Sequence, residues 1–232
     1  MPPEPGASSE LKSLVAAELT EPVDPRVSKL AAAIAAEHGA ASRAVLFYGS
    51  CLRQRQLEGL MLDFYLIVSD YRDAYAKRWL AVANRLIPPN VFYFERDGLR
   101  AKYAVLSEAD FLHECLPDAW NVSTAARFAQ PSRLVWSADE KAAETVFETI
   151  SHAAPTLLGW TGPLASGDAS AIGIWKRAFQ LTFNAELRAE RNELRNRVAL
   201  LDPAHVDPDL AGELVRKNLN VVHPDEVVLT YK

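Results

Sequence analysis

The sequence contains very little cysteine and no grouping of metal-binding side chains. Cys51 and Cys115 are the two cysteines among 232 residues, which is too few for a disulfide framework and gives no zinc-site spacing. The five histidines are scattered without ligand spacing, at positions 38, 113, 152, 205 and 223. These shortages argue against a disulfide-rich secreted domain and against a structural zinc module, and they favour a reducing cytoplasm.

A long apolar run and an excess of positive charge are missing as well. No stretch approaches the roughly 18–20 apolar residues needed to cross a bilayer. The N-terminus has Pro and Glu where a signal peptide has Lys or Arg before an apolar run. With 25 basic and 30 acidic residues the net charge is −5, unlike the basic footprint of a general nucleic-acid-binding protein. We expect a cytoplasmic protein without a nucleic-acid partner, and peripheral contact with the inner face of a membrane stays open.

The sequence does contain a pair of apolar segments joined through Gly49-Ser50. Residues 43–48 and 61–68 are nearly continuous apolar runs, typical of strands covered on both faces. Twelve residues separate Ser50 from Asp63, which lies near the start of the second segment. A glycine lets the backbone approach a phosphate, and the Ser hydroxyl and the amides of a following short helix can bind phosphate oxygens. A strand carboxylate can hold Mg²⁺ against the same phosphates, so this layout indicates a nucleotidyltransferase site.

Other interpretations of the candidate site residues stay open. Gly49-Ser50 also suits an ordinary turn between buried strands, and Tyr65 stands where nucleotidyltransferases usually carry a second strand carboxylate. Lys102, on a predicted strand, suits either a triphosphate contact or an edge-strand lysine that reaches solvent. Arg127 suits either a bidentate phosphate contact or a helix-dipole partner. Glu95 is one carboxylate that could replace the second strand carboxylate, whose position Tyr65 occupies.

The remaining pattern predicts an α/β fold with further helices. Helices are expected over 10–19, 25–38, 70–86, 107–115, 118–129 and 137–153, and a hairpin of strands 91–95 and 99–106 is expected to turn at Arg96-Asp97-Gly98. The expected buried side of the helix over 70–86 consists of Tyr71, Tyr75, Trp79, Leu80 and Val82. Further on, one long or two abutting helices over 168–201 and a terminal strand over 226–231 are expected.

Composition also predicts the domain organisation. Residues 1–9 are rich in Pro, Gly and Ser, which predicts disorder. Glycines and prolines in 155–167 mark a boundary. We therefore predict a flexible segment over 1–22 and a nucleotidyltransferase domain over 23–154, built as a mixed sheet with flanking helices. A helical domain over 155–232 would follow, with the site in the cleft between the two domains.

Several separate stretches resemble the mitochondrial-type phosphatidate cytidylyltransferase family, a soluble type of CDP-diacylglycerol synthase. The similar segments are, in chain order, Tyr48-Gly49-Ser50-Cys51, Met61-Leu62-Asp63-Phe64, Asn90-Val91-Phe92-Tyr93-Phe94, Lys102-Tyr103-Ala104-Val105, the series Trp120, Ala126, Arg127 and Pro131, and Leu181-Thr182-Phe183-Asn184-Ala185-Glu186-Leu187-Arg188. They span roughly residues 43–200. This chain departs from the family at Cys51 and Ala104, where the family has Gly, and at Glu186, where it has Asp.

The resemblance implies transfer of CMP from CTP to phosphatidate, giving CDP-diacylglycerol and pyrophosphate. It implies catalytic roles for Asp63, Lys102 and Glu186, with Asp63 and Glu186 as ligands of Mg²⁺. The nucleotide-binding residues that it implies are Tyr48, Gly49, Ser50, Tyr103, Arg127 and Arg188. A phosphate nucleophile is ionised at neutral pH, so positioning and charge neutralisation would supply the catalysis.

Two other functions remain as alternatives. The first is a nucleotidyltransferase that uses another NTP or acts on a soluble acceptor such as a sugar, a small metabolite or a protein. The second is a nucleotide-binding module without turnover, which the missing strand carboxylate at Tyr65 would suit.

Overall fold

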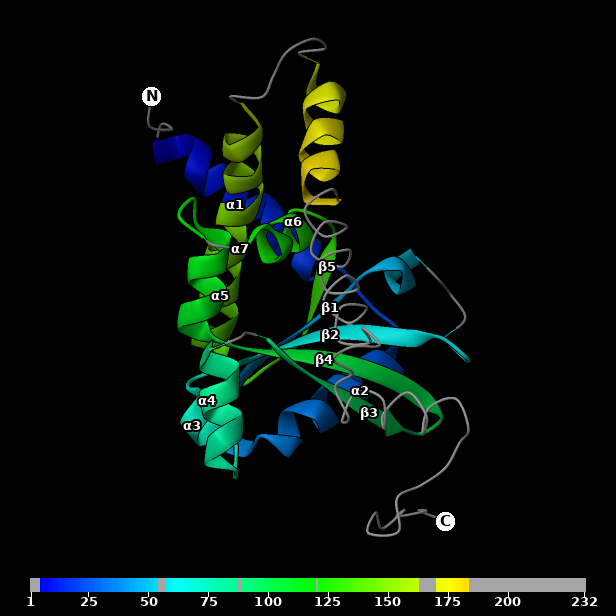
Figure 1. Cartoon of the computed structure of the whole chain (residues 1–232). Helices are drawn as coiled ribbons and strands as arrows, with labels where there is room; N and C mark the ends of the chain where they lie inside the picture. Colours follow the sequence, from blue (N-terminus) through cyan, green and yellow to red (C-terminus); the bar gives the residue numbers. More distant parts are fainter. Residues whose placement is uncertain (1–4, 54–56, 87–88, 120, 163–169, 184–232) are drawn as a thin grey trace, which may run out of the picture. The chain divides into compact units, whose positions relative to one another are not determined.

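A computed structural model describes residues 5–53, 57–86, 89–119, 121–162 and 170–183 of the chain (Figure 1). The chain divides into two compact units, one ending at Thr182 and the other beginning at Phe183. The architecture below is that of the first unit. The expected strand over 226–231 and the expected helices beyond 183 lie outside the described residues.

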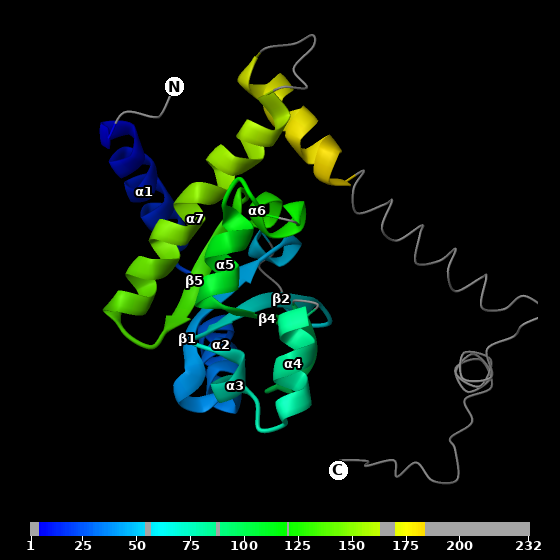
Figure 2. The ribbon, with the colours of Figure 1, turned by 60° about the vertical axis from the view of Figure 1, so that its left-hand side comes forward.

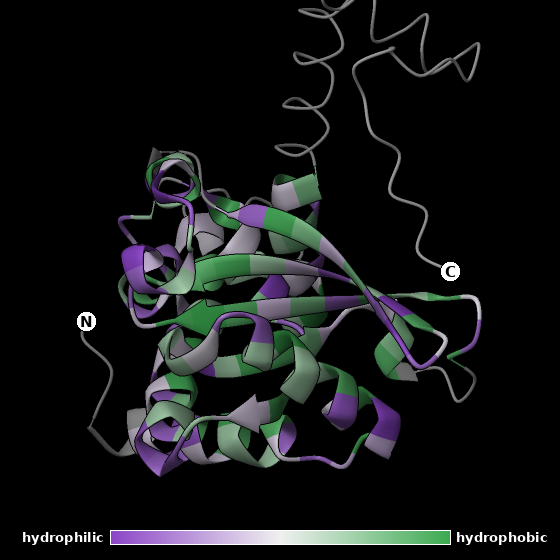
Figure 3. Ribbon diagram, turned by 90° about the horizontal axis from the view of Figure 1, so that it is seen from below, coloured by the Kyte–Doolittle hydropathy of each residue, from purple (hydrophilic) through white to green (hydrophobic). Residues whose placement is uncertain are grey.

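The centre of this unit is a five-stranded mixed sheet in the order β3-β4-β2-β1-β5 (Figure 1). The strands are β1 (Ser42–Tyr48), β2 (Met61–Val68), β3 (Asn90–Arg96), β4 (Leu99–Ser107) and β5 (Ser132–Ser137). β2 and β4 are parallel, and the other three neighbouring pairs are antiparallel. The middle strands are hydrophobic along most of their length (Figure 3). The α/β class predicted from the sequence is confirmed.

Helices cover both faces of the sheet (Figure 2). One face packs on α2 (Pro25–Glu37), α3 (Tyr71–Ala74) and α4 (Arg78–Leu86). The other packs on α1 (Pro5–Leu19), α5 (Glu108–Cys115), α6 (Val122–Phe128) and α7 (Glu140–Thr161). Short 3-10 helices, η1 (Gly39–Ala41) and η2 (Ser50–Arg53), flank β1, and a further helix spans 171–183. Because side chains alternate along each strand, Leu66 and Ile67 belong to opposite cores.

Local signals in the sequence are confirmed where a turn or cap decides the backbone. Asp97 and Gly98 have φ of 53° and 75°, as a two-residue hairpin turn with positive φ at both positions requires. The Asp24 carboxylate accepts from the backbone N–H of Arg26 at 2.9 Å and caps α2. The Ser107 hydroxyl accepts from the backbone N–H of Asp110 at 3.1 Å and caps α5.

Two of the expected helices differ from the structure, and one strand was not expected. The helix expected over 70–86 is interrupted, because Tyr75 has extended φ and ψ and separates α3 from α4. Trp79 and Val82, expected to be buried, are 64% and 58% exposed. α6 starts four residues later than expected, at Val122. β5 was missed because residues 132–137 show no clear alternation, and pairing with β1 makes them a strand.

The two ends of this unit also differ from the expectations. α1 begins at Pro5, so the structure describes residues 5–9 as part of a helix, where the composition predicts disorder. α7 continues through Pro155 to Thr161, so the boundary expected between 154 and 155 falls inside a helix. Packing carries α7 past the proline: Leu157 is fully buried, and the Thr156 hydroxyl donates to the Cys115 carbonyl at 2.8 Å.

Candidate active site

Asp63 lies near the start of β2, between the two neighbouring strands that carry other predicted site residues. It is opposite Tyr48 of β1 and opposite Lys102 of β4 in the sheet register. The Lys102 Nζ is 3.3 Å from the Asp63 Oδ1, so the two groups form an ion pair. The Lys102 side chain is 55% exposed, which leaves its ammonium accessible to a ligand. The sheet thus brings together the predicted carboxylate and the predicted lysine.

The Asp63 Oδ1 is buried, yet it accepts no hydrogen bond from any residue that the structure describes. Lys102 is close enough for electrostatic attraction but is not aligned as a hydrogen-bond donor to this atom. A buried acceptor without a donor is costly, typically by about 1–3 kcal/mol and more when charged. The Lys102 ammonium offsets part of that cost, and a metal ion on this carboxylate would offset more, since a carboxylate oxygen is a ligand that Mg²⁺ favours. The residues present therefore fit a magnesium ion at Asp63.

Gly49 places backbone directly against the second oxygen of this carboxylate. Its φ is +93°, a conformation that glycine adopts without strain. A Cβ at this position would be 3.3 Å from the Asp63 Oδ2, tighter than nine in ten real Cβ contacts, so the carboxylate would have to shift by a few tenths of an ångström. The backbone angle therefore favours glycine, and the tight space adds to that preference, as the predicted close approach requires.

The short helix expected after Gly49 is η2, a single 3-10 turn of four residues. Such a turn has too few aligned peptide groups for a substantial macrodipole. A helix dipole therefore contributes little to phosphate binding here, and the donors offered by this segment are its individual N–H groups and the Ser50 hydroxyl. Cys51, which stands at a glycine position of the resembling family, is buried and donates from its Sγ to the Met61 carbonyl at 3.5 Å.

A cavity of about 290 Å³ opens beside Gly49. Its lining consists of Tyr48, Gly49, Ser50, Leu52, Arg127, Gln130 and Pro131. Four of the predicted nucleotide-binding residues, from β1, η2 and α6, thus lie around one space. Gln130 was not predicted, because a lone glutamine near the end of a helix carries no distinguishing pattern in the sequence.

Two tyrosines hold Arg127 at this cavity. The Arg127 guanidinium carbon is 5.0 Å from the Tyr48 ring centre and 5.8 Å from the Tyr65 ring centre, within cation–π range. Its Nη1 also donates to the Tyr65 hydroxyl at 3.0 Å. Burial raises the pKa of Tyr48, so that phenol stays neutral beside the guanidinium. Tyr65, at the position of the missing carboxylate, therefore positions a cation.

Of the remaining predicted carboxylates, Glu95 is described by the structure and does not line this cavity. Glu95 is exposed on β3 and accepts a hydrogen bond from the Tyr93 hydroxyl. Glu186, Arg188 and Trp120 lie outside the described residues. Among the residues that are described, no cluster of three metal-ligating side chains occurs. A second carboxylate for a metal at Asp63 is therefore not identified within that part of the chain.

No protein-family model matches the chain, and a search of curated proteins found no significant match. Within the described ranges, no helix combines the length and the apolar character needed to span a membrane. The Asp63–Lys102 ion pair, the glycine turn and the Arg127 guanidinium lie toward the same end of β1 and β2, where Tyr48 is opposite Asp63. Such a set of groups suits a polyphosphate together with a divalent cation.

Tyr103 was predicted to bind nucleotide, but its side chain lies on the opposite face of the sheet from Tyr65. It belongs to a cluster with His38, Tyr75 and Phe92. Burial lowers the pKa of His38, so the imidazole is neutral. Its Nδ1–H donates to the Ala74 carbonyl at 2.9 Å, and its Nε2 accepts from the Tyr103 hydroxyl at 3.0 Å. Tyr103 is therefore a core residue in this structure.

Replacing Tyr103 by Phe is expected to affect stability and not nucleotide binding. The change removes the donor to His38 and leaves the aromatic packing, so we expect a loss of about 1 kcal/mol in the free energy of unfolding. Urea denaturation and a nucleotide titration by calorimetry measure the two effects separately. A large loss of nucleotide affinity with an unchanged unfolding curve would contradict this placement of Tyr103.

Proposed function

We propose that this protein is a Mg²⁺-dependent nucleotidyltransferase, with Asp63 at its centre. The observation that carries the proposal is the environment of the Asp63 carboxylate. One oxygen lies against the glycine turn, and the other is buried beside Lys102 without a hydrogen-bond donor among the described residues. Gly49 lets the backbone come close to this carboxylate, and a phosphate site held by a strand carboxylate needs such close backbone approach.

The described residues support specific roles. Asp63 would hold Mg²⁺, which neutralises charge on the triphosphate when it is bound. The Ser50 hydroxyl and the N–H groups of the turn would bind phosphate oxygens next to Gly49. Lys102 and Arg127 would offset the negative charge that develops in the transition state. Arg127 is already oriented by Tyr48 and Tyr65, so little conformational freedom is lost on binding.

The preferred reaction is transfer of CMP from CTP to phosphatidate. A phosphate oxygen of the lipid forms a bond to the α-phosphorus, and the bond from that phosphorus to the bridging oxygen of pyrophosphate breaks. The products are CDP-diacylglycerol and pyrophosphate. Several segments resemble the mitochondrial-type phosphatidate cytidylyltransferases and follow one another in the same order along the chain, which supports this choice of substrates. The acceptor phosphate is ionised at neutral pH, so no dedicated general base is needed.

A nucleotide-binding module without turnover is the second candidate, and one observation favours it. Tyr65 occupies the position of the usual second strand carboxylate and is committed to Arg127. A site with one strand carboxylate can bind a nucleotide–metal complex and yet lack the ligands that activate it. In that case nucleotide would bind and no pyrophosphate would be released with any acceptor.

Pyrophosphate release separates these candidates. The full chain is incubated with CTP and Mg²⁺ in mixed micelles containing phosphatidate, in parallel with micelles of phosphatidylcholine and with soluble glycerol 3-phosphate. Release that depends on phosphatidate supports the lipid acceptor. Release with glycerol 3-phosphate alone identifies a soluble acceptor and overturns the lipid one. Nucleotide binding without release in any mixture overturns the enzymatic function.

A further inference from the structure

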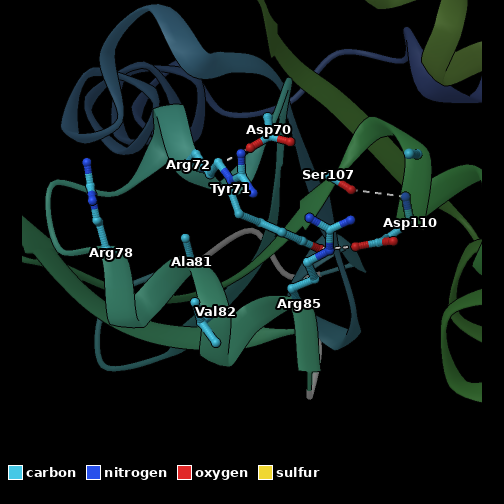
Figure 4. A pocket seen from close by; sticks show the side chains of 10 residues that line it. Asp70, Tyr71, Arg72, Arg78, Ala81, Val82, Arg85, Ser107 and Asp110 are labelled. Carbon is cyan, nitrogen blue, oxygen red and sulfur yellow. Dashed lines mark hydrogen bonds between the residues drawn. The ribbon is translucent and has the colours of Figure 1, made fainter.

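A second cavity, of about 690 Å³, lies away from Asp63 (Figure 4). It opens where the parallel strands β2 and β4 end, between the segment containing α3 and α4 and the start of α5. Asp63 is five residues before the end of β2, about 17 Å away along the strand at about 3.3 Å per residue. The two cavities share no lining residue, so they are separate sites.

Three arginines line this second cavity: Arg72, Arg78 and Arg85. Arg78 and Arg85 are two turns apart on α4, about 10 Å along the helix axis, with Ala81 and Val82 on the same face between them. In Figure 4, Arg85 extends toward Tyr71 and Asp110, and Arg78 lies at the other end. The arginines therefore cover the length of the cavity rather than one point.

The guanidinium groups of these arginines form no ion pair with any described residue, unlike Arg26, Arg43 and Arg133, which pair with carboxylates. The cavity also contains two carboxylates, and both accept a hydrogen bond from another residue of its lining. Asp70 caps α3 by accepting from the backbone N–H of Arg72 at 2.7 Å. Asp110 accepts from the Tyr71 hydroxyl.

Apolar surface accompanies these cations. Trp79 and Val82 of α4 are 64% and 58% exposed, although the sequence places them in an apolar pattern. Ala81 and Val82 line the cavity, whereas Trp79 is exposed outside its lining. A ligand of this region would therefore meet both positive charge and apolar surface.

We propose that this cavity binds an organic phosphate, through the guanidinium groups of Arg72, Arg78 and Arg85. Guanidinium forks match the geometry of phosphate oxygens, and a cavity of this volume accommodates a small organic ligand. The distance from Arg78 to Arg85 suits an extended ligand or neighbouring headgroups better than one isolated phosphate. Ala81 and Val82, which line the cavity, suit the organic part. The same chemistry is offered by a soluble phosphate ester and by a phospholipid headgroup.

Two probes distinguish these sources. The soluble probe is glycerol 3-phosphate, titrated by calorimetry at low ionic strength. The lipid probe is sedimentation with phosphatidylcholine vesicles, with and without phosphatidylglycerol, a lipid that is not the acceptor of the proposed reaction. Binding of glycerol 3-phosphate identifies a soluble ligand. Binding to vesicles that contain phosphatidylglycerol, without binding of glycerol 3-phosphate, identifies a phospholipid headgroup. Binding of neither probe overturns the proposal.

The test variant is Arg78→Ala combined with Arg85→Ala. We expect binding of the effective probe to weaken at least about tenfold, as for the loss of one charge-assisted hydrogen bond or more. The matched control is Lys29→Ala with Lys141→Ala, which removes two exposed cations from other helices. Equal binding by wild type and the arginine variant, or an equal loss in the lysine control, overturns the proposal.

Asp63→Asn keeps this test independent of the proposed function. The variant is expected to bind the effective probe as wild type does, whether or not the chain transfers nucleotides. A loss of probe binding in Asp63→Asn would assign the phosphate to the first site and overturn a separate one. Because all three arginines are exposed, circular dichroism is expected to show an unchanged fold in the arginine variant.

Discussion

Asp63→Asn is expected to reduce nucleotidyl transfer at least about a hundredfold, which corresponds to about 3 kcal/mol in the activation barrier. The amide has nearly the same shape as the carboxylate but lacks the charge that holds Mg²⁺ beside the triphosphate. It also removes the ion-pair partner of Lys102. Initial rates of pyrophosphate release at saturating CTP and Mg²⁺ measure the effect. A Mg²⁺ titration is expected to show that the variant needs a higher Mg²⁺ concentration for half-maximal activity.

The matched control for this change is Asp118→Asn, an identical substitution at an exposed aspartate. We expect its transfer rate to equal that of wild type. Asp63→Asn is not expected to lower the free energy of unfolding appreciably, because Asp63 Oδ1 accepts no hydrogen bond from the described residues. Wild-type activity in Asp63→Asn would refute the metal-binding role.

Gly49→Ala is expected to abolish most activity as well as to lower stability. A non-glycine residue at φ +93° costs roughly 1–2 kcal/mol. In addition, the new Cβ would be 3.3 Å from the Asp63 Oδ2 and would displace the carboxylate or the turn. A misplacement of about 1 Å can cost about a hundredfold in rate, so this smaller displacement is expected to cost roughly tenfold. Urea denaturation and pyrophosphate release give the two quantities.

Gly98→Ala separates strain from crowding. Gly98 also has positive φ, +75°, but a Cβ there would meet no atom within 4 Å. We expect a similar loss in the free energy of unfolding and no loss of transfer activity beyond that caused by unfolded protein. If Gly98→Ala lost as much specific activity as Gly49→Ala, the contact between Gly49 and Asp63 would not be the cause.

Several parts of this protein follow from local sequence alone. The apolar runs 43–48 and 61–68 form β1 and β2, because an unbroken apolar segment between turn residues suits a strand buried on both faces. Asp97-Gly98 determines the hairpin, since both positions need positive φ. The interval from Gly49 to Asp63 indicated a phosphate site, because glycine and carboxylate are required by the chemistry itself.

Other features depend on contacts between distant segments and had no signal in the sequence. β5 became a strand by pairing with β1, and α7 passed Pro155 because buried packing outweighed the local penalty. Alternation along β4 put Lys102 beside Asp63 and Tyr103 on the other face, although the two are neighbours in the chain. The resemblance had assigned Lys102 and Tyr103 to one site.

The electrostatics of the two cavities were decided only by the tertiary structure. Tyr65 orients Arg127 because β2 and α6 pack together, 62 residues apart in sequence. The arginine-lined cavity arises because α3 and α4 are separate helices that meet the start of α5. Residue types and spacing determined which chemistry the chain can perform. Side-chain direction and long-range packing decided which of those groups meet, because such contacts depend on positions in space that neighbouring residues do not encode.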